Sequence, residues 1–362
     1  MVLVPTWKRQ RRVVMPTFNQ NILNGFVEVF SKQAEILVEQ LQKIFNKKEI
    51  DLYDYMSRCT LDTFCETSMG ATINAQTTDC EYMRWINSIF ISFKCYKHVA
   101  FHYRLLKKKR LDYQKKLAES KEEHQSFYEE GSVKRKTFLD QLIESSDKTG
   151  ANLTDVELRD EVDTFMIAGS DTTASIVSFA LVMLAMFPEM QDKVYEEVSE
   201  VLGSDKPVEW TDLGKFVYLE RVLKETLRLF PVGIGVARSV SKELELDGYI
   251  LPAGSTAVVI TLALHRDPEV WPDPLRFDPD RFLPEEVSKR HPYSWIPFSG
   301  GPRNCIGPKY AMMAMKALTA TVVRQYKLST TYKKVEDIKL QFDVAIRPVH
   351  GYKISMELRN SA

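Results

Sequence analysis

The sequence has few cysteines, and none of them stands in a Cys-x-x-Cys pair. The five are Cys59, Cys65, Cys80, Cys95 and Cys305. Structural zinc sites are usually built from closely spaced cysteine pairs, so this pattern argues against a zinc site. An odd and sparse set of cysteines also argues against a disulfide framework and indicates a reducing compartment.

The sequence also lacks an excess of charge and a long apolar run. Its 49 basic residues balance 49 acidic ones, so no overall field favours nucleic acid or an anionic membrane surface. The apolar start of MVLVPTWKRQRRVV and the charge-free run at 174–187 are both shorter than the about 20 apolar residues that a bilayer span needs. We therefore expect neither a signal peptide nor a membrane span in this chain.

What the sequence has in abundance is helical periodicity. A turn-rich stretch at 144–155 precedes the longest helical segment, which Thr154 or Asp155 can cap, with Glu157 in the first turn. The charged stretch 107–136 is typical of a solvated helix face. Apolar spacing predicts helices over 20–46, 54–68, 81–93, 156–187, 188–202, 216–230 and 308–326.

Strand signals are confined to the last third of the chain. Asp247-Gly248 separates two short β-prone runs within 244–260, which predicts a hairpin. Residues 265–308 are rich in proline and aromatic residues without a steady period, and the C-terminal tail alternates weakly. With no repeat and no linker, the sequence predicts a mainly α fold with a small β part (α+β), forming one domain over residues 1–362.

The middle of the longest predicted helix carries an unusual polar patch, IAGSDTTAS at 167–175. Gly169 disfavours a helix interior, and Asp171, Thr172 and Thr173 compete for backbone hydrogen bonds, so a local bulge or kink is expected. A hydroxyl beside a carboxylate is also suited to deliver protons. The alternative is a helix interface of small residues with a satisfied threonine.

Two further patterns place charged or aromatic side chains on one helix face. Glu225 and Arg228 are three residues apart, and Arg281 in FDPDRF can reach them from the irregular region, which makes either a buried cluster or an ordinary surface pair. Trp7 and Arg11 are four residues apart. They suit a buried carboxylate or an acidic cofactor group, or else belong to a basic amphipathic helix.

The motif FSGGPRNCIG, at 298–307, surrounds one cysteine with glycines. These glycines permit a tight backbone and the close approach of a planar ligand. Pro308 is typical of the first turn of a helix, so Cys305 lies just ahead of a helix N-terminus, where the dipole favours a thiolate. Arg303 adds positive charge nearby.

A thiolate in this place is either a nucleophile or a metal ligand. His265 and His291 are the nearby candidates for a general base, and neither has a distinctive context. A haem iron ligand is the more natural interpretation, because a flat loop that donates N–H groups to sulfur suits a macrocycle.

Together these motifs resemble the cytochrome P450 superfamily of haem-thiolate monooxygenases, in the order that the family has them. The cysteine loop is similar to its haem loop, AGSDTT at 168–173 to its oxygen-activating helix, and WKRQR to its Trp-x-x-x-Arg helix. The resemblance covers essentially the whole chain. It implies the cytochrome P450 fold, lacking its N-terminal helices and strands, and haem b as the cofactor.

The resemblance also implies roles for single residues. Asp171 and Thr172 correspond to the acid–alcohol pair that relays protons. Glu225, Arg228 and Arg281 correspond to a structural triad. Cys305 is similar to the axial thiolate, which is the metal ligand, and the remaining cofactor contacts correspond to Trp7, Arg11, Ala168, Arg238, Phe298, Arg303 and Gly307.

The sequence is similar to the clan of fatty-acid ω-hydroxylases and related insect enzymes, with two departures. Ala168 and Ser170 stand where many of that clan carry a glutamate and a histidine, so a covalent haem link is not expected. The chain also begins inside what the resemblance identifies as the third major helix. We therefore expect an N-terminally truncated form or a fragment, without the membrane anchor.

The implied reaction inserts one oxygen atom from O2 into a hydrophobic organic substrate: a fatty acid, hydrocarbon, hormone or xenobiotic. Electrons come from NADPH through an NADPH–cytochrome reductase, with cytochrome b5 as a further donor. The full-length protein would be on the cytosolic face of the endoplasmic reticulum membrane. The alternatives are a non-catalytic haem- or lipid-binding truncation product and a cysteine-nucleophile hydrolase.

Substrate contacts are expected from the central helix and from two later segments, 232–236 and 346–350. The reductase is expected to dock on the cysteine side of the protein, against Arg9, Arg12 and Lys309. The candidate substrate contacts are Phe165, Ala168, Thr172, Val232, Ile234, Val236 and Ile346.

Overall fold

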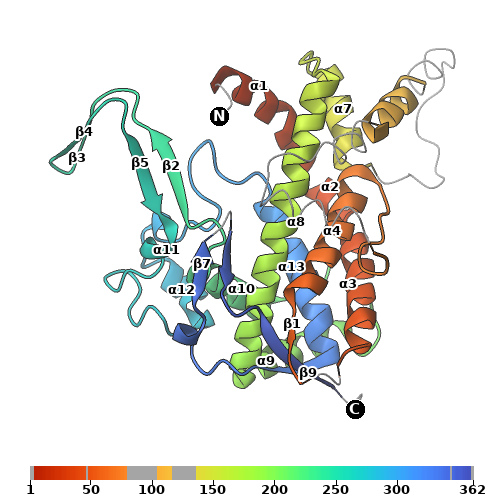
Figure 1. Ribbon diagram of the computed structural model, residues 1–362, viewed down its shortest axis with the longest axis vertical. Coiled ribbons are helices and arrows are strands. Elements are labelled where there is room, and N and C mark those ends of the chain that lie inside the picture. Colours follow the sequence, from red (N-terminus) through yellow and green to blue (C-terminus); the bar gives the residue numbers. More distant parts are fainter. Residues whose placement is uncertain (1–3, 46–47, 80–103, 116–135, 343–344, 360–362) are drawn as a thin grey trace.

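The computed structural model describes residues 4–45, 48–79, 104–115, 136–342 and 345–359 (Figure 1). The helix expected at 81–93, and residues 116–135 of the charged stretch, lie outside the described residues. Residues 104–115 are helical, as their pattern predicts. The described chain is mainly helical with small sheets, which confirms the expected fold class.

The longest helix, α8 (Asp155–Met186), runs through the middle of the molecule (Figure 1). Thr154 and Glu157 form the capping box that starts it, each side chain bonding the other's backbone N–H. Of the described helices, α8 alone is long and apolar enough to cross a membrane, which the sequence pattern did not indicate. However, 78% of its most apolar window is buried inside the protein, against α4 and its other neighbours α10 and α13.

The helix expected over 20–46 is divided in two. After α2 the chain turns at Gly25, and Phe26 is fully buried against the ring of Phe138, with the ring centroids 4.8 Å apart. Tertiary packing of Phe26 therefore overrides the continuous periodicity. The remaining helices are α1 (Val4–Val14), α2 (Gln20–Asn24), α3 (Val27–Gln42), α4 (Tyr53–Met69), α7 (Phe138–Lys148), α9 (Pro188–Leu202), α10 (Val217–Leu229), α11 (Thr261–Leu264), α12 (Pro284–Val287) and α13 (Pro308–Gln325).

The strands form small antiparallel sheets. β1 and β6 both pair with β9, β2 pairs with β5, β3 with β4, and β7 with β8. Asp247 and Gly248 both have positive φ, at 49° and 80°, and make the predicted hairpin turn between β3 and β4. The strands are β1 (Ile50–Asp51), β2 (Gly235–Ser239), β3 (Leu244–Leu246), β4 (Tyr249–Leu251), β5 (Thr256–Ile260), β6 (Tyr326–Ser329), β7 (Leu340–Phe342), β8 (Ile346–Pro348) and β9 (Lys353–Leu358).

The polar patch of α8 does not bulge. The backbone stays α-helical through it, and Ser170, Thr172 and Thr173 each donate their hydroxyl to the carbonyl four residues earlier, at 2.6–2.8 Å. Such back-bonding satisfies the hydroxyls without breaking the helix. The expected bulge is therefore wrong.

Gly169 has a packing role instead. A Cβ built on it would lie 2.1 Å from the Phe64 ring, so only glycine lets α8 and α4 approach this closely.

We predict that Gly169→Ala destabilises the protein by about 1–3 kcal/mol, because the added methyl group overlaps the Phe64 ring and forces α4 away from α8. Denaturant-induced unfolding measures the change in the free energy of unfolding. Gly214→Ala is the matched control, since a Cβ there meets nothing within 4 Å. The Gly169→Ala/Phe64→Leu double variant should recover part of the loss, and equal stability of the two single alanine variants would contradict the packing role.

Candidate functional site

The cysteine loop is closed by backbone hydrogen bonds. The N–H of Cys305 donates to the carbonyl of Phe298 at 2.8 Å, and that of Asn304 to the carbonyl of Gly301 at 3.1 Å. Gly301 and Ser299 have positive φ, at 74° and 62°, which the tight backbone requires. The helix after the loop, α13, begins at Pro308 as the sequence predicts.

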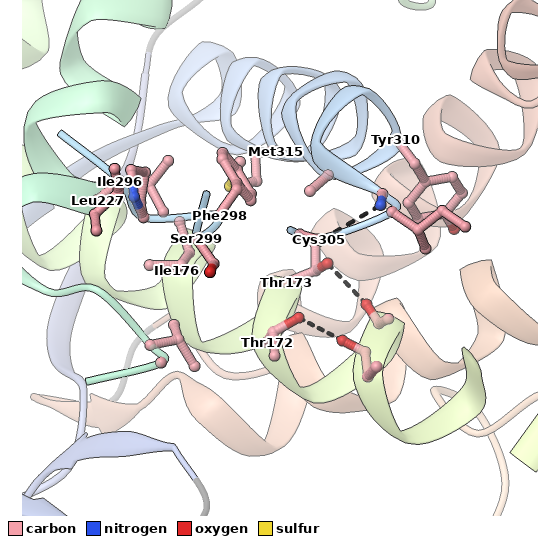
Figure 2. Close-up of a pocket in the computed structure, with 18 of the residues that line it drawn as sticks. Thr172, Thr173, Ile176, Leu227, Ile296, Phe298, Ser299, Cys305, Tyr310 and Met315 are labelled. Carbon is pink, nitrogen blue, oxygen red and sulfur yellow. Dashed lines mark hydrogen bonds between the residues drawn. The ribbon is translucent and has the colours of Figure 1, made fainter. Parts of the chain in front are cut away.

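The Cys305 side chain is exposed and lines a cavity, close to the start of α13 (Figure 2). Its Sγ accepts the N–H of Gly307 at 3.4 Å, which helps to orient the sulfur. The surrounding protein raises the pKa of the thiol through desolvation, while the Gly307 N–H and the charge of Arg11 act in the opposite direction. Because a thiolate is the form that binds a metal ion, metal binding here would release the thiol proton.

Helix α1 holds the cysteine loop from one side. Arg11 donates to the backbone carbonyl of Asn304 at 2.8 Å and to its side-chain Oδ1 at 2.7 Å. The Arg303 guanidinium lies 3.9 Å from the centroid of the Trp7 ring, a cation–π arrangement. The structure therefore places Trp7, Arg11 and Arg303 around the loop that carries Cys305. The resemblance of the sequence motifs predicts that these four residues lie near one another.

The cavity beside Cys305 has a volume of about 320 Å³ and is mostly apolar. Phe165, Ala168 and Thr172 of α8 line it, and so do Val232, Val236 and the loop residues Phe298, Cys305 and Gly307.

Two of the expected substrate contacts do not line the cavity. Ile346 is fully buried in β8, where its N–H donates to the carbonyl of Val232 at 3.3 Å. Ile234 packs against the core, and its carbonyl accepts the N–H of Leu262. Both residues therefore support the wall that Val232 and Val236 form.

The neighbours Asp171 and Thr172 face different surroundings. Thr172 faces the cavity, and its hydroxyl donates to the Ala168 carbonyl at 2.6 Å (Figure 2). The carboxylate of Asp171 is buried and accepts hydrogen bonds from Arg347, at 2.8 Å, and from the Tyr53 hydroxyl. The structure does not bring the two side chains together as a directly bonded pair.

Glu225 and Arg228 form a fully buried bidentate pair on α10, with both N–O distances 2.7 Å. Arg281 approaches the same carboxylate at 3.5 Å. Burial raises the pKa of Glu225, and the hydrogen bonds from Arg228 oppose that effect. The surface-pair alternative is excluded, because neither side chain has exposed surface.

One predicted residue lies away from the site, and three residues of the site were not predicted. Arg238 is exposed on β2 and donates only to the carbonyl of the preceding residue among the described side-chain contacts. Asn304, Tyr53 and Arg347 were not singled out from the sequence, since their partners are distant in the chain. Only the position of Asn304 next to Cys305 in the sequence could have indicated that it belongs to the site.

The two histidines do not serve Cys305 as a base. His265 is fully buried, and its Nε2 accepts the N–H of Ile296, while burial lowers its pKa to about 4. His291 Nδ1 accepts the N–H of Tyr293 in its own turn. These contacts leave the cysteine-nucleophile hydrolase without support. The cavity instead fits a planar iron cofactor, because Cys305 offers a sulfur ligand and the wall is mostly apolar, and Arg11 and Arg303 lie at the adjoining loop.

Comparison with known proteins agrees with this site. The family model "Cytochrome P450" matches residues 2–356. The chain is 39% identical to "Cytochrome P450 4V2" of Mus musculus, covering 98% of this chain and 72% of that protein. It is 35% identical to "Cytochrome P450 4c3" of Drosophila melanogaster and 37% identical to "Cytochrome P450 4c21" of Blattella germanica, each over 98% of this chain and over 72% and 75% of those proteins.

A solved structure has the same fold. The "Crystal structure of cytochrome P450DA heme domain" superposes with a TM-score of 0.86 at 22% identity, covering 100% of this chain and 78% of that one. The similarity extends over α1 to β9, so the described helices and strands follow one known arrangement.

We predict that Glu225→Gln lowers the free energy of unfolding by about 3–5 kcal/mol, because it leaves the buried guanidinium of Arg228 without a countercharge. Denaturant-induced unfolding followed by circular dichroism provides the measurement. Asp54→Asn is the control, since it removes an exposed i,i+4 pair with Arg58 and should cost about 0.5 kcal/mol. Similar losses for the two variants would show that the buried pair is not a structural anchor.

Proposed function

Because this chain belongs to the cytochrome P450 family, we propose that it oxidises a hydrophobic organic molecule in the cavity beside Cys305. It is a cytochrome P450 monooxygenase, and its cofactor is haem with a cysteine thiolate as iron ligand. One observation carries the proposal: the Cys305 sulfur and the Thr172 hydroxyl line the same apolar cavity. The substrate class is a fatty acid, hydrocarbon, hormone or xenobiotic, matched to that apolar wall.

The proposed reaction consumes one substrate RH, O2, NADPH and one proton, and gives ROH, water and NADP⁺. Bound haem supplies the activation of O2 and the oxidation of the C–H bond. Cys305 binds the iron, and the N–H of Gly307 holds its sulfur in place. Thr172, whose side chain lines the cavity, is the proposed group for moving a proton into it, with Asp171 as its proton source.

The acidic groups of the cofactor need cationic partners, and helix α1 and the cysteine loop offer them. Arg11 and Arg303 lie at the cysteine loop with Trp7, and we propose that these three contact the propionates. Arg238 is the proposed fourth contact, from the exposed strand β2. Ala168, Phe298 and Gly307 would contact the macrocycle, since they line the cavity without charge.

We further propose that residues 1–362 act as one haem-thiolate monooxygenase domain. Its electrons would come from an NADPH–cytochrome reductase, with cytochrome b5 as a further donor. The proposed location is the cytosolic face of the endoplasmic reticulum membrane. These proposals rest on the family of the chain.

We predict that the reduced, haem-loaded protein binds carbon monoxide and gives the absorption band of thiolate-ligated haem. Cys305→Ala should abolish that band, because the sulfur is the iron ligand. Cys65→Ala, at a buried cysteine in α4, is the control and should keep it.

NADPH-dependent oxidation with reductase then separates the enzyme from a non-catalytic haem- or lipid-binding protein. The thiolate band without any substrate oxidation across the proposed classes would favour the second function. Absence of the band from the wild-type protein would contradict both the ligand and the reaction.

Reductase docking generates a second prediction. Arg9, one of the expected contacts, is already paired with Glu157 and bonded to the Ala151 carbonyl, so its charge is largely compensated. Arg12 and Lys309 are exposed on α1 and at the start of α13. We predict that Arg12→Glu/Lys309→Glu slows transfer of the first electron about 10-fold or more at low salt, because it removes steering charge.

Stopped-flow reduction over a range of ionic strengths measures this effect, and the double variant should show a weaker salt dependence than the wild type. Lys333→Glu is the control, in the exposed loop after β6. If the control slows reduction as much as the double variant, the docking face is not the cysteine side.

A further inference from the structure

Ser299 is the one residue of the cysteine loop other than glycine that has a positive φ, at 62°. In this left-handed conformation the Cβ of an L-residue comes too close to the backbone, and only glycine escapes the clash. The next two positions of the loop are glycines, yet the chain places a serine here. Serine at this position therefore has a conformational cost that glycine would not have.

The hydroxyl of Ser299 adds a second cost. Its Oγ is buried and has no hydrogen-bond partner, so it loses the hydrogen bonds that it makes in water. Ser299 lines the cavity, and Figure 2 shows it beside Phe298 on the wall. In the part of the chain that the structure describes, no other cavity-lining side chain carries a buried oxygen or nitrogen atom without a partner. Glycine would remove both costs, so the hydroxyl itself needs an explanation.

An unpaired hydroxyl is not a general feature of this cavity. The hydroxyls of Thr172 and Thr173, on the wall formed by α8, donate to carbonyls of their own helix at 2.6 and 2.8 Å. The Tyr310 hydroxyl lies 3.0 Å from Thr67 Oγ1. These three groups are satisfied by the protein, whereas Ser299 is left to bond with something that enters the cavity.

The loop also places Ser299 close to the sulfur. The preceding residue, Phe298, accepts the backbone N–H of Cys305 at 2.8 Å, so this bond joins the segments that carry Ser299 and Cys305. Both side chains line the cavity. The sulfur accepts one long hydrogen bond, from the N–H of Gly307 at 3.4 Å. A thiol is a weak acceptor, whereas a thiolate is charged and accepts stronger hydrogen bonds. Conversion of the thiol to a thiolate therefore creates the acceptor that the Ser299 hydroxyl lacks.

We propose that Ser299 donates its hydroxyl to the Cys305 sulfur when that sulfur binds the haem iron as a thiolate. The inference rests on the proposed function, in which Cys305 is the iron ligand. Ser299 is then a second donor to the sulfur, besides the N–H of Gly307, and it tunes the ligand. A hydrogen bond to a ligand sulfur stabilises negative charge there, so it favours the ferrous state and raises the reduction potential of the haem.

The first test measures the midpoint reduction potential of the haem-loaded protein by spectroelectrochemical titration. Ser299→Ala and Ser299→Gly both remove the hydroxyl, and only the glycine variant also removes the cost of the positive φ. Both should shift the equilibrium toward the ferric state by about 10-fold, which is about 59 mV for one electron. Unchanged potentials in both variants would overturn the proposal. So would a shift in the alanine variant alone, because it would come from the backbone.

The second test identifies the acceptor. Resonance Raman spectroscopy of the ferric, haem-loaded protein measures the stretching frequency of the bond between iron and the Cys305 sulfur. Loss of the hydrogen bond leaves more negative charge on the sulfur and strengthens its bond to iron, so both Ser299 variants should raise this frequency. A lower potential with an unchanged iron–sulfur frequency would overturn the proposal, because the hydroxyl would then bind another acceptor, such as a haem propionate.

Ser294→Ala is the matched control. Ser294 is a buried serine in the turn before the loop, five residues ahead of Ser299, and it does not line the cavity. This variant should leave the potential and the iron–sulfur frequency unchanged, and a shift as large as that of the Ser299 variants would contradict a specific role for Ser299. Absence of the thiolate band from the wild-type protein would overturn the proposed function as well. A normal wild-type band with unchanged Ser299 variants would overturn the role of Ser299 alone.

Discussion

The buried carboxylate of Glu225 is the interaction on which the rest of the structure depends. It accepts two hydrogen bonds from Arg228 and one from the backbone N–H of Asp278, and Arg281 lies beside it. Arg228 in turn donates to the carbonyls of residues 265, 274 and 276. A charge without exposed surface is stable only when it is paired and fully hydrogen-bonded. The irregular chain that leads to the cysteine loop is therefore fastened to α10 by side chains rather than by strands.

The sequence predicted the fold wherever the signal is local. Capping at Thr154, the positive-φ turn at Asp247-Gly248 and the start of α13 at Pro308 each depend on a few neighbouring residues. The break after Gly25 could not be predicted, because it follows from packing of Phe26 against a ring more than a hundred residues away. The bulge expected in α8 was wrong, since hydroxyls that compete with the backbone also bond to it from within a helix.

The site was predictable to the extent that its residues share a short motif. The loop around Cys305 carries its own geometry, and the spacing of Trp7 and Arg11 puts both at that loop. Ile234 and Ile346 were placed in the cavity on segment position alone, but the structure packs Ile234 against the core and buries Ile346 in β8. Tyr53 and Arg347 escaped notice because their contacts join α4 and β8 to α8.

Asp171 and Thr172 show most clearly that two neighbours in the sequence need not interact in the structure. An acid beside an alcohol indicates a relay when the two are read as neighbours along the chain. On a continuous α-helix the same adjacency separates them, because the turn that points Thr172 at the cavity points Asp171 at Arg347. The helix is continuous through both residues. The direction in which the Asp171 carboxylate faces therefore matches its partners on α4 and β8, and the helix motif alone does not reveal it.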